Sequence, residues 1–312
     1  MGQIDRKPPV VIGIVGDSAA GKTTMAAGLV RALGSERTVC ICTDDYHRFS
    51  RKQRAERGLT PHDADCNYMD ILEQHVALLR DGQPILKPVY NHNGGVLDPP
   101  EYVEPKSFII LEGLLGYATP ALREAYDVKL YLEPQEPLRL KWKFQRDVGH
   151  SGYTVEQVMA ALDKLNTDSA RFVCPQRAYA DMVVGFYPPA ERPDEAGAGL
   201  NVRHILRPTL PYLDLAPLLE MGADTGFLLE LARDIDGRPV DALHILGSID
   251  DRQATAMEAL LWNQIPDAPA VRAGLGQFTD GEDRQRFSRS LALSQLLITH
   301  FLVNAALGHH VP

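Results

Sequence analysis

Short apolar runs alternate with longer segments of helical periodicity over the first 187 residues. The runs have the length and the Val, Ile and Leu content of buried strands: "VVIGIV", "TVCICT", "FIILEG", "VKLYLE" and "MVVGFY". The segments between them are long enough for crossover helices. Because neighbouring parallel strands need such crossovers, the pattern predicts an α/β fold with a doubly wound, mostly parallel sheet and helices on both faces.

The pattern changes at "YPPAERPDEAGAGLN", residues 187–201, where Pro, Gly, Ala and acidic residues replace periodic apolar ones. We expect a linker there. Beyond it, "NVRHILR", "FLLELARD" and "DALHILGSI" have strand patterns, and "DDRQATAMEALLWNQI" and "SRSLALSQLLITHFLV" have helical ones. The sequence therefore predicts a core over 1–187 and a smaller α+β extension over 188–312, and it leaves open whether the extension continues the core sheet.

Charge and composition narrow the classes of partner. The 312 residues carry a net charge of −9, which argues against a general nucleic-acid binder. Residues 1–187 hold 22 basic and 24 acidic side chains, whereas 188–312 hold 10 and 17 and no lysine. Cations are thus concentrated in the core.

Compartment and membrane contact are predicted from the apolar segments and the cysteines. The start "MGQIDRKPPV" has no apolar centre for a secretory signal, and "LALSQLLITHFLV" looks too short and too polar to cross a bilayer. Four cysteines without zinc-type spacing suit a reducing compartment. We expect a cytoplasmic protein without a membrane or nucleic-acid partner.

The stretch "GDSAAGKTT" stands between the first strand-like run and a helical pattern, and it matches G-x-x-x-x-G-K-[ST]. Glycines let the backbone turn tightly and aim N–H groups at phosphates, Lys22 reaches the terminal phosphates, and the Thr23 hydroxyl can bind Mg²⁺. The alternative is a glycine-rich turn without a ligand. The predicted nucleotide-binding residues are Gly16, Asp17, Ser18, Ala19, Ala20, Gly21, Lys22, Thr23 and Thr24.

Two further acidic positions follow strand-like runs, at the sheet edge where doubly wound folds bind ligands. In "CICTDDYHRFSR", Asp44 and Asp45 would point to opposite sides if the strand continued, so at most one of them would face the transferred phosphate. His47 and Arg51 add contacts for an anionic substrate. In "FIILEGLL", Glu112 is placed to bring a second carboxylate beside a metal. Solvated strand-end charges are the alternative at both places.

A cationic helix face and a polar loop complete the candidate chemistry. In "LRLKWKFQRDVGHSGYT", the residues Arg139, Lys143, Arg146 and Asp147 share one helical face, and Gly149 and Gly152 follow. This pattern is typical of a solvated helix or of a lid whose cations neutralise phosphoryl charge and whose acid meets Mg²⁺. In residues 87–105, an irregular hairpin or loop is expected, and "YNH" supplies Tyr90 and His92 as candidate readers of sugar hydroxyls.

Six motifs in this order resemble the phosphoribulokinases, within the wider uridine-kinase-like group of phosphate-loop kinases. They are "GDSAAGKTT", "TDDYHRFSR", "KPVYNHNGGVLDPP", "LEGL", "KFQRD" and "CPQRAYADMVV", and the likeness covers about residues 10–187. The resemblance implies transfer of a phosphoryl group from ATP to the C1 hydroxyl of D-ribulose 5-phosphate.

The resemblance also implies residue roles. Asp44 would be the general base, and Lys143 with Arg146 would stabilise the transferring phosphoryl group. Glu112 and Asp147 would lie by the Mg²⁺ and the nucleotide. The sugar phosphate would be held by His47, Arg51, Tyr90 and His92. A homodimer is expected.

Three positions depart from the family pattern, and other functions stay open. Ala20 stands where plant members have a redox-active cysteine in the phosphate loop, Leu115 replaces an imidazole, and Ser151 replaces an arginine. The open alternatives are a kinase of the same fold for another sugar phosphate, a nucleoside or a small alcohol, a nucleotide-dependent switch or hydrolase, and a catalytically silent binding protein.

Overall fold

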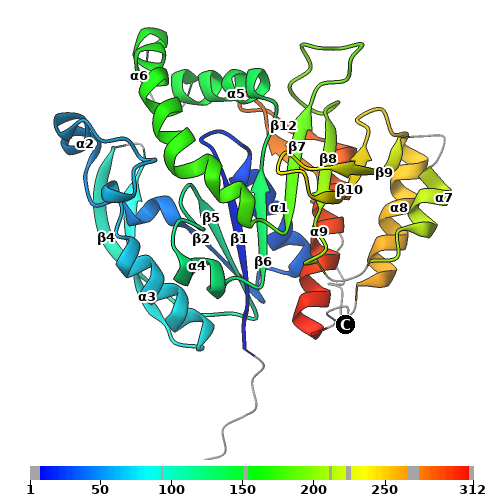
Figure 1. Cartoon of the computed structure of the whole chain (residues 1–312), viewed down its shortest axis with the longest axis horizontal. Helices are drawn as coiled ribbons and strands as arrows, with labels where there is room; N and C mark the ends of the chain where they lie inside the picture. Colours follow the sequence, from blue (N-terminus) through cyan, green and yellow to red (C-terminus); the bar gives the residue numbers. More distant parts are fainter. Residues whose placement is uncertain are drawn as a thin grey trace, which may run out of the picture.

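A computed structural model describes residues 8–92, 94–149, 154–210, 213–222, 226–265 and 274–308. Within them, one central sheet has the strand order β2-β5-β1-β6-β7-β8-β10-β9 (Figure 1). Its strands are β1 (Val10–Gly16), β2 (Thr38–Cys42), β5 (Phe108–Gly113), β6 (Val128–Leu132), β7 (Met182–Tyr187), β8 (Asn201–Leu206), β9 (Phe227–Arg233) and β10 (Pro239–Ile245).

The strands from β2 to β7 pair in parallel, as the alternating pattern predicted. Every residue of β1 and β5 is buried, because helices cover both faces. The helices are α1 (Lys22–Leu33), α2 (Arg51–Arg57), α3 (Met69–Arg80), α4 (Pro120–Ala125), α5 (Glu136–Gly149), α6 (Val155–Asp168), α7 (Ala216–Gly222), α8 (Asp251–Gln264) and α9 (Arg289–Leu307). The predicted α/β phosphate-loop fold is confirmed.

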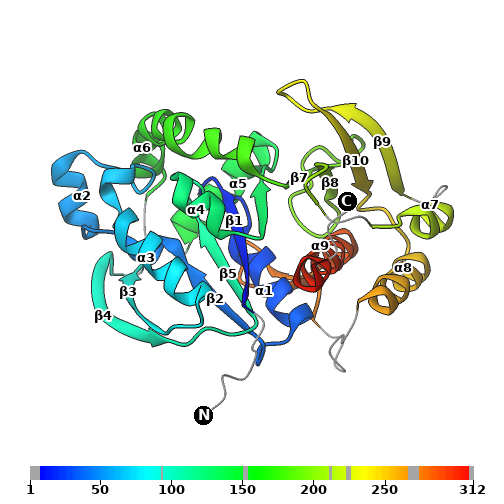
Figure 2. The same cartoon turned by 60° about the horizontal axis from the view of Figure 1, so that its bottom comes forward.

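Alternate side chains of β1 belong to two different apolar clusters. Ile12 and Ile14 pack in the cluster that contains α1, α8 and α9, whereas Val11 and Val15 pack in the cluster that contains α3 and α4 (Figure 2). Successive side chains of a strand point to opposite faces, so this division is what a sheet between two helical layers requires.

The sheet continues beyond residue 187. Strand β8 pairs antiparallel with β7, and β10 and β9 follow antiparallel at the edge. The loop over 188–200, where a linker was expected, therefore joins two neighbours in one sheet. Two hairpins lie outside this sheet, formed by β3 (Ile85–Asn91) with β4 (Val96–Val103) and by β11 (Gln277–Thr279) with β12 (Gln285–Phe287).

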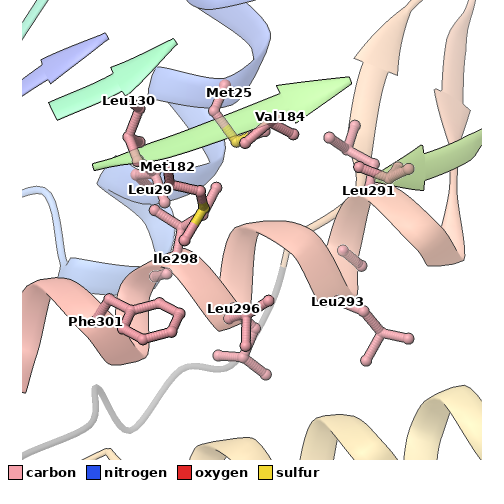
Figure 3. Packing of buried hydrophobic residues seen from close by; sticks show 14 of the residues in the cluster. Met25, Leu29, Leu130, Met182, Val184, Leu291, Leu293, Leu296, Ile298 and Phe301 are labelled. Atoms are coloured by element: carbon pink, nitrogen blue, oxygen red, sulfur yellow. The ribbon is translucent and has the colours of Figure 1, made fainter. Parts of the chain in front are cut away.

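Helix α9 is a core element from the far end of the chain (Figure 3). Ser288 caps its start, and Gly308 ends it in the left-handed conformation. It packs against α1 at Gly28, where an added Cβ would lie 2.0 Å from the Gln295 side chain. Gln295 Nε2 also donates to the carbonyl of Thr24 at 3.3 Å.

The expectation that this segment is too short and too polar to cross a membrane was wrong. With 19 residues, α9 is long and apolar enough to span a bilayer by length and composition alone. However, 72% of its most apolar 18-residue window is buried inside the fold, which is typical of a core helix.

Candidate active site

The phosphate loop joins β1 to the first turn of α1, as predicted. Gly21 has φ of 89° and Ala19 has φ of 64°, so the loop contains two left-handed residues. A Cβ on Gly16 would lie 2.6 Å from the carbonyl oxygen of Leu132, so this position requires glycine. Lys22 Nζ donates to the carbonyls of Gly16 and Asp17, at 3.0 Å each. The loop is thus shaped to bind phosphate with backbone N–H groups and one lysine.

Strand order brings the predicted carboxylates to this loop. Because β5 lies between β2 and β1, the carboxyl ends of all three meet at one edge. Thr23 Oγ1 donates to Glu112 Oε1 at 3.0 Å. A Cβ on Gly113 would lie 1.9 Å from Thr43 Oγ1 and 3.1 Å from Asp44 Oδ1, so the glycine lets the turn that carries both residues approach β5 closely.

The charge on Glu112 depends on its neighbours. Burial raises the pKa of its carboxyl above the usual value, Lys22 acts in the opposite direction, and Asp44 raises the pKa further. When both are ionised, the carboxylates of Glu112 and Asp44 repel each other unless a cation compensates their charge. The pair therefore favours the binding of positive charge between the loop and β5.

Asp44 and Asp45 have different partners, and neither lies on a strand. Strand β2 ends at Cys42, and a short 3₁₀ turn, η1 (Thr43–Tyr46), follows, so the condition of a continuing strand is not met. Asp45 forms an ion pair with Lys87 and accepts a hydrogen bond from the N–H of Tyr90 at 3.0 Å. Asp44 accepts the N–H of Leu114 at 3.3 Å. Asp45 anchors the β3–β4 hairpin, which leaves Asp44 as the carboxylate beside the loop.

The four residues expected to bind the sugar phosphate lie together. The Tyr90 ring makes edge contacts with the rings of His47 and His92, at 4.8 and 5.0 Å between centroids. Arg51 Nη2 donates to the carbonyl of His92 at 2.6 Å. His47 is 2% exposed, and its Nδ1 lies 2.6 Å from Asn67 Oδ1. Burial lowers the pKa of His47 to about 4, so this ring is neutral at pH 7.

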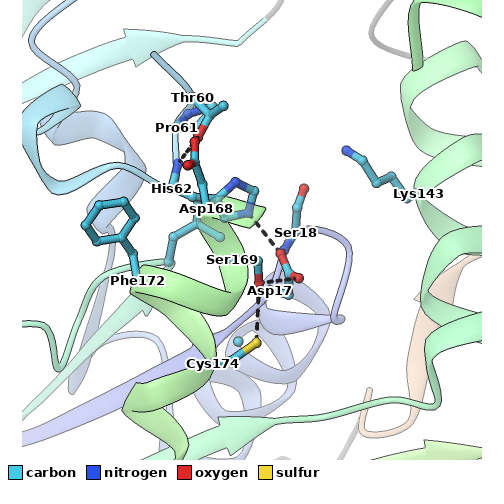
Figure 4. Close-up of polar contacts among 12 residues, drawn as sticks. Asp17, Ser18, Thr60, Pro61, His62, Lys143, Asp168, Ser169, Phe172 and Cys174 are labelled. Carbon is cyan, nitrogen blue, oxygen red and sulfur yellow. Dashed lines mark hydrogen bonds and ion pairs between the residues drawn. The ribbon is translucent and has the colours of Figure 1, made fainter. Parts of the chain in front are cut away.

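The predicted cationic face of α5 points at the phosphate loop. Arg139 Nη1 donates to the carbonyl of Ser18 at 3.0 Å, and Arg146 Nη2 donates to Ser18 Oγ at 2.9 Å. Lys143 extends toward the loop in Figure 4 and donates to Asp147 Oδ2 at 2.7 Å. Burial lowers the pKa of Lys143, and Asp147 partly compensates for this effect.

Asp147 is ionised in this arrangement. Burial alone would raise the pKa of its carboxyl, but the charges of Arg146 and Lys143 lower it below the usual value. Its Oδ1 accepts from Arg146 and its Oδ2 from Lys143. Gly149 is the last residue of α5, whereas Gly152, the second predicted lid glycine, lies outside the described residues.

Several residues of the site have no local sequence pattern that marks them. Arg54 donates to the Tyr90 hydroxyl at 2.7 Å, and Gln176 bonds the N–H of Tyr117 and the carbonyl of Leu114. His62 and Ser169 contact Asp17. Each contact joins residues more than 30 positions apart, so only the folded chain reveals it.

A pocket opens beside Asp44. The residues that line it come from η1, from the segment after α2, from α3 and from the turn after β5, and they are Thr43, Asp44, Tyr46, Pro61, Asn67, Met69, Leu72, Leu114 and Leu115. Leu115, where the resembled family has an imidazole, makes this wall apolar. Asp44 is the one carboxylate among these lining residues.

The donor set next to the loop fits Mg²⁺ better than a metal caged by protein ligands. Among the described residues, no three His, Cys, Asp or Glu side chains gather as a metal site. Thr23 and Glu112 instead supply two neighbouring oxygens. Mg²⁺ in kinases is commonly held by one or two protein oxygens together with phosphate oxygens and water.

Comparisons with known proteins agree with this geometry. Residues 11–191 match the model of the phosphoribulokinase / uridine kinase family. The chain is 36% identical over 221 residues to a phosphoribulokinase of Synechocystis sp., a match that covers 71% of this chain and 66% of that protein. It is 32% identical over 184 residues to a uridine kinase of Latilactobacillus sakei, covering 57% of this chain and 86% of that one.

A solved structure titled phosphoribulokinase from Rhodobacter spheroides has the same fold. The TM-score is 0.57 at 19% identity, and the superposition covers 83% of this chain and 98% of that one. The matched part of the chain spans between 58% and 66% of the length of the first six curated relatives.

Proposed function

The chain belongs to the phosphoribulokinase / uridine kinase family, and from this premise we propose that it transfers a phosphoryl group from ATP to the C1 hydroxyl of D-ribulose 5-phosphate. The products are ribulose 1,5-bisphosphate and ADP. The observation that carries this proposal is the position of Asp44, with a phosphate loop and Glu112 on one side and a cation-bearing acceptor region on the other.

Cations on the acceptor side support a phosphorylated acceptor. Arg51 and Arg54 both lie beside the Tyr90 ring system, and Arg51 is the more accessible of the two. Guanidinium groups pair with phosphate oxygens in a planar, two-donor geometry. A plain nucleoside has no negative charge for such a group, so the arrangement favours a sugar phosphate. His47, Arg51, Tyr90 and His92 are the proposed binding residues.

Asp44 is the proposed general base. Its carboxylate lies on the pocket wall, where it can accept the proton of an acceptor hydroxyl as the oxygen attacks. His47 would orient a neighbouring hydroxyl through the ring nitrogen that Asn67 does not hold. In the neutral His47 ring, Nδ1 donates to Asn67 Oδ1, so Nε2 can accept a hydrogen bond from that hydroxyl.

The remaining residues act on the phosphates. Lys22 and the loop N–H groups hold the nucleotide, and Lys143 and Arg146 reach over the loop to neutralise charge that develops during transfer. Thr23, Glu112 and Asp147 are the proposed ligand set for Mg²⁺, which when bound would lower the charge on the phosphate oxygens.

Release of ADP in the presence of ATP and Mg²⁺ tests the proposed substrate. We expect rapid release with ribulose 5-phosphate and little with ribose 5-phosphate, uridine or no acceptor. Release with uridine alone would assign the chain to the nucleoside branch of its family. Equal release without any acceptor would identify a hydrolase or switch.

The remaining expectations are also proposals. We place the protein in the cytoplasm, with α9 in the core and without a nucleic-acid or membrane partner, and we treat 1–187 as the catalytic core supported by 188–312. A homodimer is proposed because Leu231, on the outermost strand β9, is 89% exposed. Light scattering of the purified protein tests this state, and a monomeric mass would contradict it.

A further inference from the structure

One cluster beside the phosphate loop has no part in the proposed transfer step. Asp17, the second residue of the loop, accepts a hydrogen bond from Ser169 Oγ at 2.8 Å, and its Oδ1 lies 2.9 Å from His62 Nε2 (Figure 4). Arg139 Nη1 lies 3.5 Å from its Oδ2. The side chains of Asp17 and His62 are 17% and 2% exposed. Three segments outside the loop therefore hold one loop residue.

The Asp17 carboxylate is charged. Burial alone would raise its pKa, but the hydrogen bond and charge of His62, followed by the charge of Arg139, hold the pKa well below the usual range. Hydrogen bonds to an ionised carboxylate are shorter and stronger than those between neutral groups. The hydrogen bonds from His62 and Ser169 to Asp17 are therefore strong, charge-assisted ones.

The His62 attachment leads directly to the acceptor pocket. Pro61 and Asn67, on either side of His62 in sequence, both line the pocket next to Asp44. Asn67 Nδ2 donates to the carbonyl of Pro61 at 3.2 Å, and Asn67 Oδ1 contacts His47. A shift of His62 would consequently move the pocket wall.

The Ser169 attachment fixes the same segment from another direction. Ser169 opens a π-helical turn, η3 (Ser169–Val173), directly after α6. The preceding residue, Asp168, accepts the hydroxyl of Thr60 at 2.7 Å. Two consecutive residues thus hold both the segment around His62 and the carboxylate of Asp17. Single π-helical turns in other proteins often occur at functional sites, where they redirect a side chain.

We propose that Asp17, His62 and Ser169 form a positioning clamp that sets the distance between the phosphate loop and the acceptor hydroxyl at Asp44. This inference rests on the proposed kinase function and names positioning residues for it. The side chains of these three residues act without touching either substrate, although the backbone of Asp17 belongs to the nucleotide-binding loop. A displacement of about 1 Å between reacting groups costs on the order of 10²-fold in rate, so a clamp of this kind affects turnover more than binding.

Two variants test the clamp, His62→Leu and Ser169→Ala. We expect the dissociation constant for ATP and the KM for the acceptor to change by less than about threefold, while kcat falls on the order of 10-fold to 10²-fold. The fraction of ATP that is hydrolysed instead of transferred should rise, because a displaced acceptor lets water compete. His62→Gln keeps an N–H donor and should recover part of the lost kcat.

Thr167→Ala is the matched control, because its hydroxyl lies on α6 and bonds only the carbonyl of Asp163. Its kcat and its hydrolysed fraction should equal those of the wild type. Ser169→Ala removes a single hydroxyl, so it tests the clamp even if His62→Leu does not fold. Thermal melts of each variant confirm that folded protein is compared.

Different results would overturn the clamp and the proposed function. Wild-type kcat and hydrolysed fraction in folded Ser169→Ala and His62→Leu would overturn the clamp, and so would a loss confined to ATP affinity. A wild-type enzyme that transfers phosphate to no acceptor would overturn the proposed function itself, and this shows before any variant is made.

Discussion

Clusters of charged side chains with buried members lie in two regions of this molecule, and the cations of the two clusters have different partners. At the phosphate loop, Arg139 and Arg146 both reach across to Ser18 from a separate helix. Near the outer sheet edge, Arg177 and Arg207 both donate to Asp234, whose side chain is 1% exposed. The first set of cations is directed at a loop made to receive phosphate, whereas the second is directed at a protein carboxylate.

The outer cluster joins parts of the fold. Asp234 directly follows β9, Arg207 directly follows β8, and Arg177 belongs to the 3₁₀ turn η4 (Cys174–Tyr179). Burial alone would raise the pKa of Asp234, but hydrogen bonds from Arg177 and Arg207 hold it well below the usual range. A shifted pKa in a buried ion cluster thus does not mark an active site. The direction in which the cations point is the more informative observation.

The largest expected effect is on turnover. Asp44→Asn should lower kcat by on the order of 10²-fold to 10⁴-fold, because the acceptor hydroxyl loses its general base. ATP affinity should stay nearly unchanged, since Asp44 is not part of the phosphate loop. Steady-state kinetics and a nucleotide binding assay measure the two quantities. Unchanged turnover would mean that another group takes the proton.

Lys143→Met should lower kcat by on the order of 10²-fold, since it removes one cation from the transferring phosphoryl group. The variant should remain folded, because burial disfavours the charge of Lys143 and Arg146 still pairs with Asp147, and a thermal melt checks this. Lys141→Met is the matched control, because Lys141 lies on the same helix and donates to the carbonyl of Asp194 instead. An equal loss in both variants would contradict a specific role.

In contrast to Lys143→Met, Asp234→Asn should lower stability and leave turnover nearly unchanged. It removes the carboxylate that Arg177 and Arg207 share, and although Arg177 keeps its ion pair with Glu133, the free energy of unfolding should fall by about 3 kcal/mol. Turnover per folded molecule should remain close to that of the wild type. Urea unfolding and active-site titration provide the two values. A larger effect on kcat than on stability would contradict a purely structural role for the Asp234 cluster.

A pH dependence of stability is expected from two buried histidines outside these clusters, His47 in the acceptor region and His204 on β8. Burial lowers the pKa of His47 to about 4 and that of His204 to about 3. The unfolded chain binds these protons near pH 6.5, so it holds more protons than the folded chain between about pH 4 and 6.5. Stability should therefore fall as pH decreases through this window, by about 1 to 3 kcal/mol per histidine.

Substitutions separate the contributions of His47 and His204 to the dependence of the unfolding free energy on pH. His204→Gln should flatten the dependence of unfolding free energy on pH without a change in acceptor KM. His47→Gln should flatten it and also raise acceptor KM, since His47 lies in the acceptor region. A slope that neither variant changes would show that other groups titrate there.

The sequence predicted what local patterns determine. Buried strands, the phosphate loop and the cationic face of α5 each depend on residues within a few positions of one another, and all were found. The role of Asp45 could not be predicted in this way, because its partner Lys87 lies 42 positions away. The turn after β2 could not be predicted from alternation of apolar residues alone either. The contacts of His62 and Asp234 also join segments that are distant in the sequence, and no periodic pattern predicts them.

The contact between α9 and α1 has a consequence for how the protein is made. The phosphate-loop helix packs at Gly28 against Gln295, and Gln295 also bonds the carbonyl of Thr24, 271 residues earlier in the chain. A growing polypeptide therefore displays the whole nucleotide motif long before the helix that supports it has left the ribosome. Until α9 has been synthesised, the apolar side of α1 has to be shielded by other means, and nucleotide can stabilise the complete contact only after that point.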